Sequence, residues 1–283
     1  MTGTEVRELD VIIVGAGPAG LCAAMYAGRG MLKAVVLERG VPGGELLNTE
    51  RIEDYPGFLS ILGPELADRM AEHAKAFGAE ILQENVEGIS REPDGVFQVS
   101  TSSGTVFRAP TVILTAGGTP TKLGVPGEVE YAGRGVSYCA VCDGAFFKGE
   151  TIAVIGGGDA AVEEAEYLTR YAAKVHVIHR RGTFRASKLL QERLFGNPRI
   201  EVIWNRVVTE IQGEPSGVKA ISLESTVDGT RSTLAVTGVF VFIGFRPNSD
   251  LINGHFDHDP SGYVITDDRM MTSIPGLFAA GDL

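Results

Sequence analysis

Residues 10–20 have the sequence DVIIVGAGPAG, and they are the strongest indication of the fold. An uncharged β-branched run leads directly into Gly15-x-Gly17-x-x-Gly20, which predicts a buried strand followed by a tight turn. An alanine-rich stretch with helical character comes next, and a second apolar strand, AVVLE, ends at Glu38. Strand, glycine turn, helix, strand and acid, in this order, predict a dinucleotide-binding fold.

The turn and the acid have separate tasks in such a fold. The glycines let a pyrophosphate sit on the helix N-terminus, where the dipole favours negative charge. Glu38 would accept hydrogen bonds from the two ribose hydroxyls of an adenosine. Pro18 and Ala19 in the turn and Arg39 beside the acid complete the candidate residues. The alternative, a turn without a ligand, is disfavoured because all four parts are present. The dinucleotide is NAD or FAD.

The same pattern occurs a second time, in TIAVIGGGDAAVEEAEYL from residue 151. A predicted strand leads into Gly156-x-Gly158-x-x-Ala161, a helix follows, and KVHVIHRR predicts the next strand. The spacing from Gly15 to Glu38 equals the spacing from Gly156 to His179, 23 positions in each copy. His179 therefore stands where the first copy has its acid. The candidate cofactor residues of this turn are Gly156, Gly157, Gly158, Asp159 and Ala160.

Three arginines follow the second copy's strand, at positions 180, 181 and 185. An acid would repel a 2′-phosphate, whereas Arg180, Arg181 and Arg185 would pair with it, so this site is predicted to bind NADP(H). A solvated basic turn is the alternative, and the position of the arginines argues against it. Two nicotinamide sites in one chain would be redundant, whereas NADPH and FAD together make a hydride relay.

A cysteine pair, Cys139 and Cys142, precedes the second glycine turn and is followed by Asp143. The C-x-x-C spacing lets the two thiols close a small disulfide, and an adjacent carboxylic acid can move a proton when a thiolate leaves. Zinc would need two more ligands, and the scattered histidines offer none, so no metal site is expected. A structural thiol pair is the other alternative. Cys22 is expected to be a buried small residue of the first helix.

Composition sets the class of protein. The 283 residues, 44% hydrophobic and 22% charged, predict two soluble globular domains. The formal charge of −11 argues against nucleic acid and anionic membranes as partners. Residues 11–28 are uncharged, but the glycine and proline break argues against a membrane span. Three cysteines, and acids ahead of the first apolar run, fit a cytoplasmic protein without a signal peptide.

Charge is distributed unevenly along the chain. Residues 117–244 carry 14 basic and 14 acidic side chains, whereas the remainder carries 11 basic and 22 acidic ones. The whole acidic excess thus lies outside the middle segment. Such a shift predicts a domain inserted into another.

Taken together, GAGPAG, CAVCDG, GGGDAAVEEA, HRRGTFRA and TSIPGLFAAGD resemble the low-molecular-weight, bacterial-type thioredoxin reductases. The resemblance covers essentially the whole chain, in the family's order and spacing. It implies an α/β fold of two Rossmann-like domains, the second inserted into the first, each with a parallel sheet and a small antiparallel addition. Residues 1–115 and 246–283 would form the FAD-binding domain, and residues 116–245 the NADPH-binding domain with the cysteine pair.

The resemblance also implies an activity. Hydride would pass from NADPH to FAD and then to the disulfide, with rotation of one domain against the other, and the dithiol would reduce thioredoxin. Cys142 would be the thiol next to the flavin, Cys139 the interchange thiol and Asp143 the acid/base residue. Arg134 and Phe146 fall where the family contacts thioredoxin. A homodimer is expected on the same ground.

Further flavin contacts are implied by the resemblance, and some positions depart from the family. The implied contacts are Gly43, Gly44, Glu45, Asp54, Val86, Ala116, Gly117 and Asp282. Glu45 and Asp54 replace a common glutamine and asparagine; if ionised near the isoalloxazine, they would lower the flavin potential. Ala145 replaces a common aromatic residue. The sequence stops at Leu283, where the family continues into a helix that faces the flavin, so weaker flavin stabilisation is expected.

Four other functions stay open on the sequence. The chain could reduce another small dithiol protein, of a glutaredoxin-like or peroxidase-linked kind. An oxygen-using dithiol oxidase of the same fold would lack an NADPH site, so the arginines at 180, 181 and 185 argue against it. A non-catalytic NADPH-binding protein, or a ferredoxin reductase of this fold, would not need the CAVCD motif.

Overall fold

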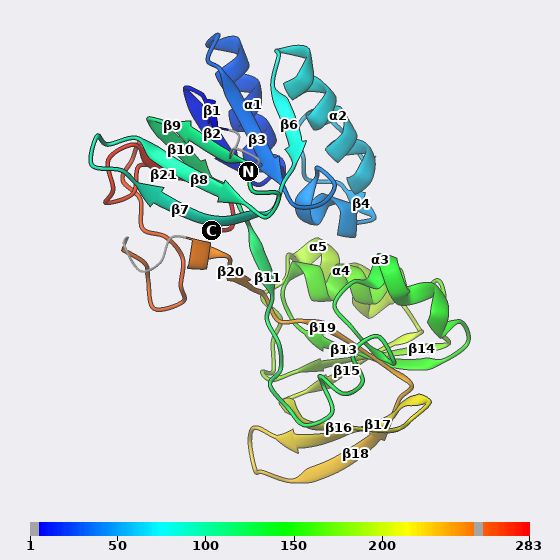
Figure 1. Cartoon of the computed structure of the whole chain (residues 1–283). Helices are drawn as coiled ribbons and strands as arrows, with labels where there is room; N and C mark the ends of the chain where they lie inside the picture. The colour runs from blue at the N-terminus through cyan, green and yellow to red at the C-terminus, as the bar shows by residue number, and fades with distance from the viewer. Residues whose placement is uncertain (1–5, 252–256) are drawn as a thin grey trace. The chain divides into compact units, whose positions relative to one another are not determined.

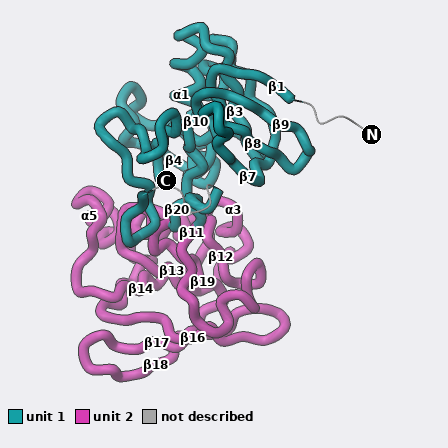
Figure 2. Tube along the Cα trace, turned by 60° about the vertical axis from the view of Figure 1, so that its left-hand side comes forward, with its two compact units in different colours: residues 1–119, 246–283 teal, residues 120–245 magenta. Residues whose placement is uncertain are grey.

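The computed structural model describes residues 6–251 and 257–283. They divide into two compact units: residues 1–119 with 246–283 (unit 1) and residues 120–245 (unit 2) (Figure 2). The chain passes from one unit to the other twice, through β11 (Gly118–Pro120) and back through β20 (Phe245–Pro247). These two strands pair with each other as a two-stranded sheet.

Unit 1 is built on a five-stranded parallel sheet in the order β21-β10-β2-β3-β6 (Figure 1). Its central strand, β2 (Val11–Val14), is buried along its whole length because both faces of the sheet are covered. The helices α1 (Pro18–Arg29) and α2 (Gly63–Ala76) pack on one face. The other strands are β3 (Ala34–Glu38), β6 (Glu80–Gln83), β10 (Thr111–Leu114) and β21 (Leu277–Ala279).

A second sheet covers the opposite face of that core, in the order β1-β9-β8-β7. Its strands are β1 (Val6–Glu8), β7 (Val86–Arg91), β8 (Phe97–Thr101) and β9 (Val106–Ala109). Strands β7, β8 and β9 pair antiparallel with one another, whereas β1 pairs parallel with β9. Short elements complete the unit: η1 (Gly44–Asn48), β4 (Arg51–Ile52), β5 (Ile61–Leu62) and η3 (Ser249–Leu251).

Unit 2 repeats this plan. Its parallel sheet has the order β12-β19-β13-β14-β15. The strands are β12 (Val136–Ser137), β13 (Thr151–Gly156), β14 (Lys174–His179), β15 (Ile200–Trp204) and β19 (Gly238–Phe242). The helices are α3 (Ala140–Asp143), α4 (Asp159–Leu168) and α5 (Lys188–Gly196), with η2 (Gly144–Phe147). An antiparallel sheet of β16 (Arg206–Glu214), β17 (Gly217–Ser225) and β18 (Arg231–Ala235) is the addition.

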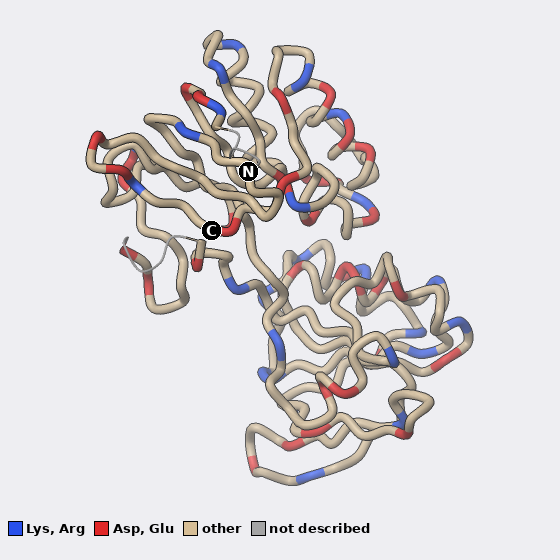
Figure 3. Tube along the Cα trace, viewed as in Figure 1, with Lys and Arg blue, Asp and Glu red and all other residues tan. Residues whose placement is uncertain are grey.

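Four strands of each parallel sheet have the same order, β10-β2-β3-β6 in unit 1 and β19-β13-β14-β15 in unit 2. The fifth strand comes last along the chain in unit 1 (β21) and first in unit 2 (β12). In each, the strand before the glycine turn (β2 or β13) lies between the strand that follows the helix and a later strand (β10 or β19). This confirms the predicted α/β class with two Rossmann-like folds. Figure 3 shows side chains of both charges at many points along unit 2. Within the described ranges, no helix has the length and apolar character of a membrane span.

Candidate active site

The first glycine turn presses against the end of the neighbouring strand. Gly15 has φ 103°, and a Cβ there would collide with the carbonyl of Thr115. A Cβ on Gly20 would collide with the carbonyl of Gly15, so the first turn of α1 packs directly on the strand end. The hydroxyl of Thr115 lies within hydrogen-bond distance of the carbonyls of Val14 (2.9 Å) and Gly15 (2.8 Å), which share its one O–H. Thr115 therefore holds the turn in place.

Glu38 and a second loop surround the middle of this turn. The Oε2 atom of Glu38 accepts the N–H of Ala16 at 2.7 Å, and Oε1 accepts the N–H of Gly40 at 2.9 Å. Each carboxylate oxygen keeps a further lone pair for a ribose hydroxyl. The N–H of Gly43 donates to the carbonyl of Ala16 at 2.8 Å, and a Cβ on Gly44 would lie 3.0 Å from the Cα of Gly17.

The segment near the C-terminus reaches the same turn. A Cβ on Gly281 would lie 3.1 Å from the Cβ of Ala19, so Asp282, which is exposed, follows directly after a contact with α1. Asn248 ties down the predicted residues Ala116 and Gly117: its side-chain amide donates to the carbonyl of Ala116, and its N–H donates to that of Gly117. The structure thus brings together candidates from five separate stretches of sequence.

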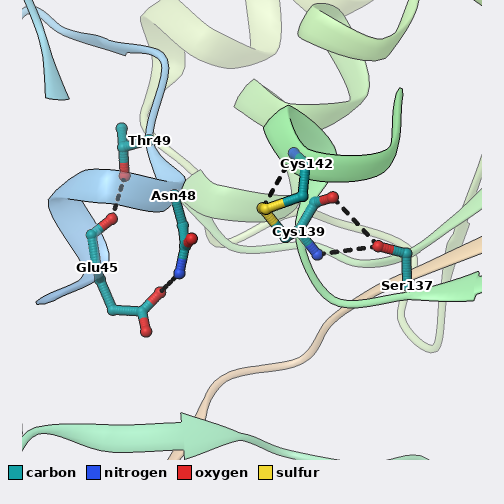
Figure 4. The surroundings of a disulfide bond; sticks show 6 residues. All are labelled: Glu45, Asn48, Thr49, Ser137, Cys139 and Cys142. Atoms are coloured by element: carbon teal, nitrogen blue, oxygen red, sulfur yellow. Dashed lines mark hydrogen bonds between the residues drawn. A yellow bond between two sulfur atoms is a disulfide. The ribbon is translucent and has the colours of Figure 1, made fainter. Parts of the chain in front are cut away.

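The remaining predicted residues of unit 1 lie outside this group of contacts. Val86 is buried in the core at the start of β7. Arg39 is exposed, as is Asp54 in the loop between β4 and β5. Glu45 is exposed in η1, where its carboxylate accepts the side-chain amide of Asn48 (Figure 4).

Both long helices that follow a glycine turn begin without a side-chain cap. Gly17 precedes α1 and Gly158 precedes α4, and neither helix start has a side-chain hydrogen bond. A Cβ on Gly158 would meet nothing within 4 Å, and one on Gly17 only the Cα of Gly44, at 4.0 Å. Open space in front of exposed N–H groups suits an anionic pyrophosphate, so both turns fit a dinucleotide.

The second glycine turn repeats the first with one difference. Gly156 has φ 155°, and a Cβ there would collide with the carbonyl of Phe242 at the end of β19, as Gly15 does with Thr115. The middle residue is Gly157, and a Cβ there would collide with the imidazole of His179. His179 is only 7% exposed. Its ring therefore fills the space behind the turn.

The arginine segment folds back onto this turn (residues 180–187, the arginine loop). The N–H of Arg185 donates to the carbonyl of Gly157 at 2.9 Å, and that of Ser187 donates to the carboxylate of Asp159 at 2.7 Å. The Nε2 atom of His179 lies 3.0 Å from the carbonyl of Thr183. The side chains of Arg180, Arg181 and Arg185 are exposed. The loop thus presents three cations beside the turn.

Burial lowers the pKa of His179, and the charges of Arg181 and Arg180 add to the lowering. The backbone hydrogen bonds to Gly156 and Thr183 oppose this effect without cancelling it. The imidazole is therefore neutral at pH 7, and its Nε2–H tautomer donates to Thr183.

Cys139 and Cys142 form a disulfide at the start of α3, with Cα atoms 5.3 Å apart. The N–H of Cys142 donates to the sulfur of Cys139 at 3.1 Å (Figure 4). The hydroxyl of Ser137 accepts the N–H of Cys139 and donates to its carbonyl, each at 3.1 Å. Asp143, half-buried, is the last residue of α3, and its N–H donates to the carbonyl of Cys139. This disulfide confirms the prediction that Cys139 and Cys142 can act as a redox pair.

The predicted partner contacts lie on exposed segments of unit 2. Phe146 is 81% exposed, and Ala145 beside it is exposed as well. The guanidinium of Arg134 donates to the carbonyls of Glu130 (2.6 Å) and Pro215 (3.3 Å), which holds it at the surface. No group of three His, Cys, Asp or Glu within residues 6–251 and 257–283 has the arrangement of a metal site.

The model of one protein family, pyridine nucleotide-disulphide oxidoreductase, matches residues 9–283. The chain belongs to this family. It is 48% identical over 280 residues to the thioredoxin reductase of Bacillus subtilis, a match that covers 99% of the chain and 88% of that protein. It is 47% identical over 280 residues to that of Listeria innocua, with 99% and 87% covered. The crystal structure of Lactococcus lactis thioredoxin reductase is similar, with a TM-score of 0.94, 44% identity, and 97% and 90% of the chains covered.

Three supporting residues of this oxidoreductase were missed by the sequence analysis, and one expectation was wrong. These residues are Thr115, Asn248 and Ser137. Their hydrogen-bond partners are distant in sequence or follow no periodic pattern, so only the folded structure identifies them. Cys22 was expected to be buried but is exposed. Leu21 and Ala24 take the inward face of α1, so the helical rotation of 100° per residue turns Cys22 outward.

Proposed function

We propose that this chain is an NADPH-dependent flavoprotein that reduces the disulfide of thioredoxin. The observation that carries the proposal is the Cys139–Cys142 disulfide in the same unit as a glycine turn with three arginines beside it. Its relatives from Bacillus subtilis and Listeria innocua, both named thioredoxin reductases, support the choice of partner.

The first turn is the proposed FAD site. The open N–H groups at the start of α1 would bind the pyrophosphate, and Glu38 would accept the ribose hydroxyls while it holds the turn through Ala16. The loop at Gly43–Gly44 and residues 116–117 and 281–282 would line the rest of the site. When bound, FAD supplies a two-electron carrier between a nicotinamide and a disulfide.

The second turn is the proposed NADPH site. The start of α4 would hold the pyrophosphate, and Arg180, Arg181 and Arg185 would pair with the 2′-phosphate. His179 is buried, so we infer that it does not touch the phosphate. Instead, it would hold the arginine loop in position through Thr183.

The reduced cysteine pair would act by thiol–disulfide exchange. The Cys139 thiolate attacks one sulfur of the thioredoxin disulfide and releases the other as a thiolate, which gives a mixed disulfide. The Cys142 thiolate then attacks the Cys139 sulfur, releases thioredoxin's second thiolate and restores the disulfide seen here. Asp143 would donate the proton that a departing thiolate takes up. Phe146 would supply an apolar contact to the partner.

We also infer a cytoplasmic homodimer. The family resemblance supports the dimer, and a redox cycle through a dithiol suits a reducing compartment. Gel filtration with light scattering tests the dimer, for which twice the 30.0 kDa chain mass is expected.

Thioredoxin-dependent oxidation of NADPH, with FAD added, tests the function. We expect turnover that stops when thioredoxin is left out. Cys139→Ser and Cys142→Ser should each abolish this turnover but leave reduction of the flavin by NADPH intact, whereas Cys22→Ser, the control, should change neither. A flavin-loaded protein without thioredoxin turnover would contradict the proposed partner.

A further inference from the structure

A buried carboxylate lies close in sequence to the disulfide and has no part in the exchange. Glu128 is 1% exposed. Its Oε1 atom accepts the N–H of Leu123 at 2.8 Å and the hydroxyl of Tyr138 at 2.7 Å, and its Oε2 atom accepts the N–H of Gly124 at 2.7 Å. A buried carboxylate needs such donors, and three of them also give it a fixed orientation.

The three donors come from two segments with different tasks. Leu123 and Gly124 belong to the stretch that continues from β11, the first passage between the units, and the N–H of Thr121 in that stretch donates to the carbonyl of Gly244 just before the second passage. Tyr138 is the residue immediately before Cys139. Glu128 thus joins the connecting stretch to the residue next to the redox pair.

Ser137, the residue before Tyr138, also fixes the backbone near the disulfide. Ser137 binds both the N–H and the carbonyl of Cys139 through its hydroxyl. Burial, and then the hydrogen bond to and charge of Glu128, raise the pKa of Tyr138 far above its usual range, so its hydroxyl stays a donor throughout the working pH range. Side-chain hydrogen bonds of Ser137 and Tyr138, the two residues before Cys139, therefore support its backbone.

We propose that Glu128 is a positioning residue that, through the Tyr138 hydroxyl, holds the Cys139 backbone where its sulfur meets Cys142. Two thiols held in this way have a high effective concentration for each other, which favours the disulfide. Without the bridge, the segment before Cys139 has more conformations, and closing the disulfide costs more entropy. The role in catalysis rests on the proposed function, but the effect on the cysteine pair does not.

Equilibration of Tyr138→Phe with dithiothreitol tests the bridge without any partner protein. Dithiothreitol gives two electrons and two protons to the Cys139–Cys142 disulfide, and yields two protein thiols and its own cyclic disulfide. After alkylation, mass spectrometry reports the oxidised fraction; Cys22 takes one label in either state. We expect the equilibrium to shift about tenfold toward the dithiol, which corresponds to about 30 mV.

Two further variants complete the experiment. Glu128→Gln, which places an amide N–H₂ against a backbone donor, should shift the equilibrium in the same direction. Glu150→Gln, an exposed glutamate of the same unit that accepts a hydrogen bond from Thr237, is the control and should leave it unchanged. The KM for NADPH should be unaffected in Tyr138→Phe. An equilibrium within about twofold of the parent in folded Tyr138→Phe would overturn the proposal, even if Glu128→Gln failed to fold.

Discussion

The turn at Gly15–Gly17 and the turn at Gly156–Gly158 differ in what supports the middle residue. In the first, a carboxylate (Glu38) accepts the N–H of Ala16. In the second, an imidazole (His179) lies where a Cβ of Gly157 would be. Gly156 and Gly15 share the same contact with a strand end, so the backbone plan is common. The difference therefore lies in the residue 23 positions on, which sets the charge beside each turn.

Glu38 and His179, the residues that differ at this position, are followed by different loops. After Glu38 the chain forms a hydrogen-bonded bend at Gly40, and the carboxylate stays beside the turn at Ala16. After His179 the chain forms the arginine loop, which returns to the turn through the N–H of Arg185. One turn thus has an acid suited to hydroxyl groups, and the other has cations suited to a phosphate.

Removal of the arginine side chains should have the largest effect on the difference between the two turns. Arg180→Ala with Arg181→Ala is expected to raise the KM for NADPH by about 100-fold or more, because each charge-assisted contact contributes roughly 1.5–3 kcal/mol. The KM for NADH should change little. Lys219→Ala, on an exposed position of β17, is the control. Equal loss with both nucleotides would mean that the arginines do not bind the 2′-phosphate.

A methyl group at the middle of the second turn should have the next largest effect. Gly157→Ala places a Cβ in the space of the His179 ring, and overpacking of this kind costs about 1–3 kcal/mol, or about tenfold to 100-fold in NADPH affinity. The matched change in the first turn, Ala16→Gly, creates no collision. Titration of each variant with NADPH measures the difference. Unchanged affinity in Gly157→Ala would show that the ring does not define this turn.

Low pH should lower the free energy of unfolding through His179 in the second turn. Because its pKa is lowered in the native state, the unfolded chain binds more protons between that pKa and about 6.5, and the free energy of unfolding falls as pH drops through this window. His176, whose pKa burial also lowers, adds to the effect. Thermal unfolding at pH 7.5 and 5.5 measures it. His179→Gln, which keeps an N–H for Thr183, should reduce the pH dependence; an unchanged dependence would contradict the assignment.

The smallest expected effect concerns two exposed carboxylates of unit 1, Glu45 and Asp54. Glu45→Gln with Asp54→Asn should raise the midpoint potential of the bound flavin, because two carboxylates near the isoalloxazine would disfavour an anionic reduced form. Equilibrium dye titration of the parent and the variant compares the potentials. Identical midpoints would show that neither carboxylate acts on the flavin.

Local patterns explain why much of this could be predicted from sequence. The strands, turns and helices around Gly15 and Gly156 depend on neighbours within about 25 positions, so their class and order follow from spacing. The place of His179 does not follow from spacing, because its ring is buried among the glycine turn, the arginine loop and Trp204. Thr115 and Glu128 likewise act through contacts that no periodic pattern marks.

Nucleotide preference tests the central claim most directly. The kcat/KM for NADPH and for NADH should be measured with thioredoxin as the acceptor and FAD present. An exposed arginine loop beside the second turn predicts a preference for NADPH of at least about 100-fold. NADH used as well as NADPH would contradict the account, because the difference between the two turns would then have no effect on which dinucleotide binds.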